Sequence, residues 1–266
     1  MKQTQKWYDV FCNCSGRPRR HPGDCCLRIT NTPVYRPDLA VYSQTEEVAL
    51  GREPTWNSPD ITTNDWGPFR LMESIGVRIT NRSAKANAGN ALINLYIGTF
   101  GIGMPVRLYA SQKTTVWAGN AVDLLFPLDE TLRSADSPQR LSVMVKTEHP
   151  YDTEPINNTG FQCIDGRQTS LAGRHFSVDI PIRNPHPSAT RRIDLQVKPG
   201  PLTATISWDH YVFGPLEEKI VRLDVTVPDE IHESDDTPGK LPVTVIATYN
   251  GGSLLGGATI IARIDS

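Results

Sequence analysis

The feature that most constrains this 266-residue chain is an alternation of apolar and polar residues at every second position, repeated along many short segments. In VRLDVTV, for example, Val221, Leu223, Val225 and Val227 alternate with polar residues. A period of two places the apolar side chains on one face of a strand and the polar side chains on the other. The pattern therefore predicts antiparallel sheets with one buried face, and it predicts that these four side chains point inward.

The alternating segments fall into two series, separated by a stretch near residues 150–172 in which Pro, Asn, Thr and Gly accumulate. Each series suits a sandwich of about 100 residues. We predict an all-β protein made of two tandem Ig-like antiparallel β-sandwiches, preceded by an extended cysteine-rich N-terminal arm. The predicted division gives residues 1–37 to the arm, 38–155 to the first sandwich and 156–266 to the second.

Charge and hydropathy exclude several classes of partner. Charged residues make up 21% of the chain and the formal net charge is −2, so the overall charge gives no case for nucleic acid as the main partner. No apolar run approaches the roughly 18 residues of a membrane helix, and we expect no insertion into a membrane. The N-terminus lacks the continuous apolar stretch of a signal peptide, so the sequence leaves the route of any export open.

The arm contains the segment FCNCSGRPRRHPGDCC, which holds four of the five cysteines. The spacings CNC and CC do not match the usual zinc ligand pairs, although a zinc site on Cys12, Cys14, Cys25 and Cys26 stays open. Free thiols, internal disulfides and disulfides between subunits are also compatible with the segment, and disulfides are favoured. Because the total is odd, at least one thiol cannot pair within its own chain. An arm thiol that pairs with Cys163 of a neighbouring copy would crosslink a polymer.

Two further segments carry charge. GRPRRH, within the arm, has three arginines and a histidine that could bind phosphate or a carboxylate-rich surface, but a solvated loop is favoured because the patch is short and lacks interleaved aromatics. Carboxylates cluster in Asp229–Asp236, where a charged loop between strands is favoured over a calcium site.

Tryptophans and glycines give two more local predictions. Trp56, Trp66, Trp117 and Trp208 could form a ligand surface, with Trp56 and Trp66 in loops before the first clear pair of strands, but burial in the core or at an interface is favoured. The segment GTFGIGMP contains Gly98, Gly101 and Gly103 but no following Gly-Lys-Ser/Thr, so it predicts a hairpin or bulge and no phosphate loop. Pro181 lies within a strand pattern and predicts a sheet edge or a bulge.

The two halves of the chain also contain segments with a similar sequence pattern. VRITNRSAKANAGNALINLYI and VDIPIRNPHPSATRRIDLQV each read as a strand, a turn containing Asn and Arg, a small polar stretch and a second strand. Together with RPDLAVYS and WNSPDI, the first of these resembles the bacterial Ig-fold modules called CARDB. PLEEKIVRLDVTVP and the segment after it are similar to Ig-like repeats of secreted bacterial proteins. The resemblance covers residues 38–265 and implies an Ig-like sandwich with a role in association or display, without catalytic residues.

These observations predict a structural protein and no enzyme. We expect a self-assembling subunit of an extracellular filament, appendage or coat, linked to other copies of itself through the arm. The alternative is a monomeric module of a secreted system that binds a glycan or a protein surface. No catalytic residue, cofactor or bound metal is expected, and the expected location is extracellular or at the cell surface.

Overall fold

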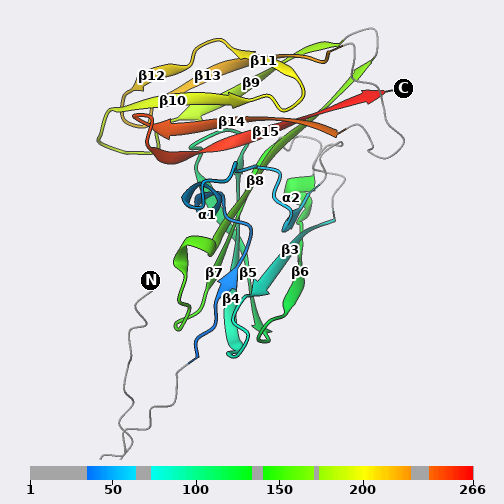
Figure 1. Ribbon diagram of the computed structural model, residues 1–266, viewed down its shortest axis with the longest axis vertical. Helices are drawn as coiled ribbons and strands as arrows, with labels where there is room; N and C mark the ends of the chain where they lie inside the picture. Colours follow the sequence, from blue (N-terminus) through cyan, green and yellow to red (C-terminus); the bar gives the residue numbers. More distant parts are fainter. Residues whose placement is uncertain (1–34, 64–72, 134–139, 171–173, 229–239, 266) are drawn as a thin grey trace, which may run out of the picture.

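The computed structural model describes residues 35–63, 73–133, 140–170, 174–228 and 240–265. In this part the chain forms two β-sandwiches, with the strands of the second running across those of the first (Figure 1), which confirms the predicted all-β sandwich fold. Residues 1–34 of the predicted arm lie outside the described residues. The elements are β1 (Leu39–Ala40), α1 (Gln44–Ala49), β2 (Ile61–Thr62), β3 (Ser74–Asn81), β4 (Ala88–Thr99), β5 (Val106–Val116), β6 (Ala121–Pro127), α2 (Glu130–Arg133), β7 (Leu141–Glu148), the 3-10 helix η2 (Pro155–Asn157), β8 (Thr159–Ser170), β9 (His175–Arg183), β10 (Arg191–Lys198), β11 (Thr203–Ile206), β12 (His210–Phe213), β13 (Glu218–Thr226), β14 (Lys240–Tyr249) and β15 (Ser253–Asp265).

The first sandwich packs a sheet centred on β3 against the sheet β5-β4-β7-β8. Strand β3 pairs with β1 and β2 along one side and with β6 along the other. Its alternating residues Ile75, Val77 and Ile79 are buried against Ile93 and Leu95 of β4. The chain changes sheet between β3 and β4, between β5 and β6 and again between β6 and β7, which is the Greek-key crossing found in Ig-like sandwiches.

The second sandwich packs the sheet β11-β13-β9 against β12-β10-β14-β15. In β13 and the residue after it, Val221, Leu223, Val225 and Val227 are at most 1% exposed, which confirms the direction predicted for the VRLDVTV strand. Strand β9 lies at the end of its three-stranded sheet, as Pro181 predicted, because proline cannot donate a hydrogen bond to a further strand.

Strand β8 belongs to both sandwiches. Its first part pairs antiparallel with β7, where Thr159 lies opposite Lys146, and its second part pairs parallel with β15, where Ile164 lies opposite Thr259. An eight-stranded sheet therefore runs through the whole molecule. The stretch predicted as a break near 150–172 contains this shared strand, and the division after residue 155 stays a prediction.

The glycine-rich segment GTFGIGMP joins β4 to β5 and forms a second connection between the sandwiches. Ile102 donates its N–H to Pro181 O at 2.9 Å and accepts the N–H of Arg183 at 2.9 Å. A side chain on Gly103, which has a φ of +71°, would overlap the carbonyl oxygen of Arg183. The predicted hairpin is therefore confirmed, and glycine lets its backbone lie directly against β9.

A buried asparagine repeats in the two sandwiches and confirms the predicted similarity between the halves. Asn81, at the end of β3, donates its amide to Ala86 O at 2.8 Å and Val116 O at 3.1 Å. Asn184, just after β9, donates its amide to Ala189 O at 2.8 Å and to Gly214 O at 2.9 Å. In each case the side chain ties the turn after its own strand to a carbonyl at the end of a further strand, Val116 in β5 or Gly214 just after β12, which satisfies buried polar groups.

Candidate interaction surfaces

Cys163 lies in the middle of β8 and is 3% exposed. Its sulfur accepts a hydrogen bond from Ser142 Oγ at 3.2 Å and donates to Gly101 O at 3.6 Å. Burial raises the pKa of the Cys163 thiol and disfavours the thiolate that disulfide exchange requires. This burial disfavours the crosslink between an arm cysteine and Cys163 of a neighbouring copy, which stays a prediction.

Trp56 is also a core residue, with 2% of its surface exposed. The backbone N–H of Trp56 donates to Thr259 Oγ1 at 3.0 Å, and its backbone carbonyl accepts the backbone N–H of Cys163 at 2.8 Å. A side chain on Gly257 would lie 2.5 Å from two carbons of the indole ring. Of the two alternatives given for Trp56, the structure therefore favours burial in the core. The indole fills the second sandwich's core and fastens the segment before β2 to β15.

Several other sites predicted from the sequence fall outside the part of the chain that the structure describes. They are Trp66, the carboxylate segment Asp229–Asp236 and the arm cysteines Cys12, Cys14, Cys25 and Cys26. Among residues 35–63, 73–133, 140–170, 174–228 and 240–265, no group of three or more His, Cys, Asp or Glu residues is arranged to hold a metal ion.

Three loops meet at the end of the first sandwich that is remote from the second sandwich (Figure 1), and we call this end the tip. They are residues 82–87 between β3 and β4, 117–120 between β5 and β6, and 149–158 between β7 and β8. Gly119 donates its N–H to Ser83 O at 2.8 Å, which joins the first two loops. Loops at one end of an Ig-like sandwich are where such folds carry binding residues.

Exposed aromatic side chains occupy the tip. Trp117 is 60% exposed, Tyr151 is 63% exposed and Tyr35 is 49% exposed. Tyr35 accepts a hydrogen bond from Lys85 Nζ at 3.0 Å, and the ammonium group lies 4.4 Å from the centre of its ring. The sequence placed Trp117 among the candidate ligand-surface tryptophans but did not single it out, because alternation does not distinguish a loop tryptophan that is exposed from one that is buried.

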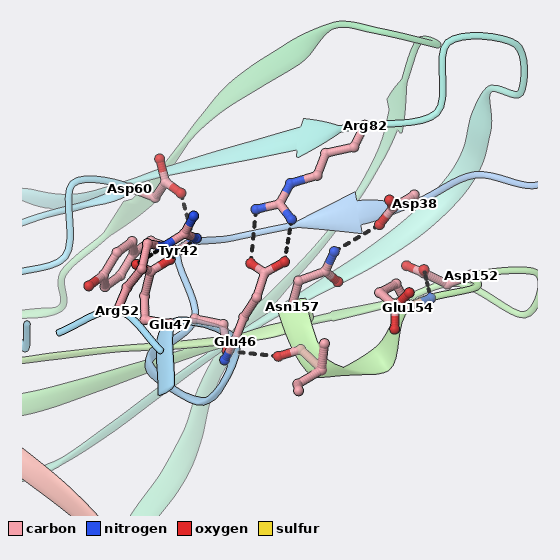
Figure 2. A network of polar contacts seen from close by, with 12 residues as sticks. Asp38, Tyr42, Glu46, Glu47, Arg52, Asp60, Arg82, Asp152, Glu154 and Asn157 are labelled. Carbon is pink, nitrogen blue, oxygen red and sulfur yellow. Dashed lines mark hydrogen bonds and ion pairs between the residues drawn. The ribbon is translucent and has the colours of Figure 1, made fainter. Parts of the chain in front are cut away.

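A polar network holds the tip loops and the segment around β1 in place (Figure 2). Asp38 accepts a hydrogen bond from Asn157 Nδ2 at 2.8 Å and, through its backbone carbonyl, from Arg82 N at 2.7 Å. Asp152 accepts the N–H of Leu39 at 3.1 Å. Two of the three tip loops are thereby tied to the entry of the chain into β1.

Helix α1 is fastened to the same loops. Glu46 forms a two-point ion pair with Arg82, with N–O distances of 2.5 and 3.0 Å, and this pairing raises the pKa of the Arg82 guanidinium (Figure 2). Ser43 caps the helix by accepting the N–H of Glu46, and it donates its hydroxyl to Ile156 O at 2.8 Å. The sequence analysis did not predict this helix, although the sequence contains the Ser-x-x-Glu pattern of a capping box, which could have indicated it.

The outer edge of β5 is protected against pairing with another chain. It pairs with β4 and with no other described strand, and it contains an irregularity at Tyr109 and the charged residues Arg107 and Lys113. Gln112 Nε2 also donates to Leu125 O of β6 at 2.6 Å. Bulges and lysines are devices that blunt edge strands. Recognition through side chains on a sheet face therefore suits this molecule better than strand addition at β5.

No protein-family model matches the chain, and no curated protein matches it in sequence. Among solved structures, it is similar to a protein of unknown function from Porphyromonas gingivalis W83, with 11% identity, coverage of 72% of this chain and 92% of that chain, and a TM-score of 0.24. It is also similar to the CupB6 tip adhesin from Pseudomonas aeruginosa, with 6% identity, coverage of 87% and 99%, and a TM-score of 0.25. A third similar structure is the calcium-binding domain CBD12 of CALX1.1, with 11% identity, coverage of 67% and 75%, and a TM-score of 0.23.

Within the described part of the chain, none of the helices is both long and apolar enough to cross a membrane.

Proposed function

We propose that this protein is a structural subunit that assembles with copies of itself through its N-terminal arm. One observation carries the proposal. Tyr35, the first described residue, contacts Lys85 at the tip, so the arm is attached at the end of the molecule remote from the second sandwich (Figure 1). An arm that leaves one end and binds the body of another copy makes a head-to-tail contact, which extends into a filament when the rotation does not close.

Two other features support this role. The strand β8 and the Ile102 contact join the sandwiches, which gives a stiff body of the kind that a filament or coat needs. The polar network at the tip fixes the residues from which the arm emerges. In this proposal the protein is a CARDB-like module at the cell surface or outside the cell and has no catalytic activity.

The arm cysteines would make the joint persistent. With Cys163 buried, the disulfides of this proposal form among Cys12, Cys14, Cys25 and Cys26 of neighbouring arms. Sedimentation velocity on the full chain under oxidising conditions should show oligomers, and replacing all four cysteines by serine should leave only weaker, concentration-dependent association. An intact chain that stays monomeric at high concentration under oxidising conditions would exclude the proposed function.

The exposed aromatic residues at the tip favour a second candidate function, the binding of a glycan by a monomer. Trp and Tyr rings provide large, rigid contact surfaces at low cost in conformational entropy. If this candidate is right, Trp117→Ala and Tyr151→Ala should each weaken the binding of a soluble polysaccharide in calorimetry. The control variant Tyr211→Ala changes an exposed tyrosine in the second sandwich. If it binds the polysaccharide as well as the unmodified chain does, the effect of the other two variants is located at the tip.

A further inference from the structure

The outer face of the sheet formed by β2, β3 and β6 contains a hollow of about 530 Å³. Its floor is Gly76, whose neighbours Ile75 and Val77 point into the core, so residue 76 faces outward. A Cβ atom on Gly76 would lie 3.3 Å from Thr62 Cβ and 3.9 Å from Leu125 Cδ2. The missing side chain therefore leaves room between these two walls.

The hollow combines an apolar wall with an acidic rim. Leu125 is 65% exposed although it is a large apolar residue. Among the described residues, the charged side chains that line the hollow are Asp60, Glu73 and Asp123 against the single cation Arg78. Arg78 and Asp123 form a long, exposed ion pair of 3.4 Å, which contributes little on its own. The excess of carboxylates leaves hydrogen-bond acceptors for a further cation.

Asp60 occupies the inner side of this rim. One of its carboxylate oxygens accepts the N–H of Tyr42 at 2.6 Å, and partial burial raises the pKa of the Asp60 carboxyl. A cation placed nearby would relieve the cost of keeping this half-buried carboxylate charged. The site therefore suits a long basic side chain with an apolar stem more than a neutral ligand.

We propose that this hollow is the docking site for the arm segment Gly16–His21 of a second copy, an inference that rests on the proposed function. The segment GRPRRH brings three arginines against the acidic rim, so the two surfaces are complementary in charge. Guanidinium groups bind carboxylates with two parallel hydrogen bonds, and their methylene stems cover apolar surface such as Leu125. Pro18 disfavours a helix and keeps the segment suited to lie along a sheet face.

The length of the arm permits this contact in another copy. His21 lies fourteen residue steps before Tyr35, and an extended chain of that many steps spans up to about 46–50 Å. The same reach includes the hollow of the same copy, so the test must separate docking between copies from docking within one copy.

Charge reversal on the full chain makes this separation. The arm variant carries Arg17→Glu, Arg19→Glu and Arg20→Glu. The second variant, which we call the groove variant, reverses two carboxylates that line the hollow and carries Glu73→Arg and Asp123→Arg. Asp60 is left unchanged because it also holds the backbone of Tyr42. The control variant carries Glu53→Arg and Glu130→Arg, two exposed carboxylates that do not line the hollow. Unchanged melting temperatures establish that every variant is folded.

Assembly is measured by sedimentation velocity under reducing conditions at low salt. The arm variant and the groove variant should each associate at least about tenfold more weakly than the unmodified chain, because like charges then face each other. The control should associate as the unmodified chain does. An equimolar mixture of the arm and groove variants should assemble again, because each arm then meets a hollow of opposite charge in the other variant. Added salt should weaken the association of the unmodified chain.

The outcomes that overturn the inference differ from those that overturn the proposed function. An unmodified chain that never associates removes both. If the unmodified chain associates through its arm but the groove variant associates equally well, the arm docks elsewhere and only the inference fails. If the mixture does not assemble, the arm of one variant does not dock in the hollow of the other and the inference is likewise overturned.

Discussion

At the scale of the residue, strand β13 separates buried from exposed apolar side chains. Leu223 is fully buried, whereas Ile220, three residues earlier, is 58% exposed. We expect Leu223→Ala to lower the free energy of unfolding by about 2–5 kcal/mol, because it leaves a cavity in the core. Ile220→Ala removes a side chain of equal volume from the surface and should cost less than about 1 kcal/mol. Urea denaturation of both variants measures the difference, and a larger loss for Ile220→Ala than for Leu223→Ala would show that the strand faces the other way.

Residues of the core were the easiest to predict, and isolated residues in turns were the hardest. Val221, Leu223, Val225 and Val227 follow from alternation alone, because a half-buried strand repeats the same environment every second residue. Trp56 stands in TWNSPD, where no period exists, and its burial depends on Gly257, far later in the chain. Such a contact between distant segments leaves no local pattern in the sequence.

At the scale of the element, the loop between β4 and β5 makes a sharper prediction about glycine. Gly103 and Gly119 have nearly the same φ, +71° and +70°, but a Cβ atom on Gly103 would meet the backbone of Arg183, whereas one on Gly119 would meet no described atom within 4 Å. Gly119→Ala should therefore cost about 1–2 kcal/mol for the left-handed backbone alone. Gly103→Ala should cost clearly more, because it also separates the loop from β9. Thermal unfolding of both variants tests this, and equal costs would mean that the loop moves away freely.

Strand β8 shows why the connection between the sandwiches was not predictable. Its sequence TGFQCIDGRQTS lacks a clean period of two, and its turn-forming residues suggested a break. Gln162, Cys163 and Asp165 are all buried, because the strand is covered on both sides where the two sandwiches meet. A strand buried on both faces does not alternate. Asp165 is accommodated by Arg140, which lies 3.1 Å away.

At the scale of the whole molecule, the shared strand predicts that the two sandwiches unfold together. Separating them would break the parallel pairing of β8 with β15, detach Ile102 from β9 and expose Trp56, which lies in the core of the second sandwich although it precedes β2. Apolar surface exposed in this way costs roughly 25 cal/mol per Å², so a half-unfolded molecule is disfavoured.

We therefore expect a single calorimetric transition for the full chain, and a mutation in either sandwich should shift the whole of it. Ile93→Ala lies in the core of the first sandwich and Leu223→Ala in the core of the second. Each variant should lower the one melting temperature, with the calorimetric and van't Hoff enthalpies in agreement, because neither core persists without β8 and its partners. Two resolved transitions, of which each variant moves only one, would show that the sandwiches are independent units. The stiff body inferred for an assembling subunit would then have a hinge at β8.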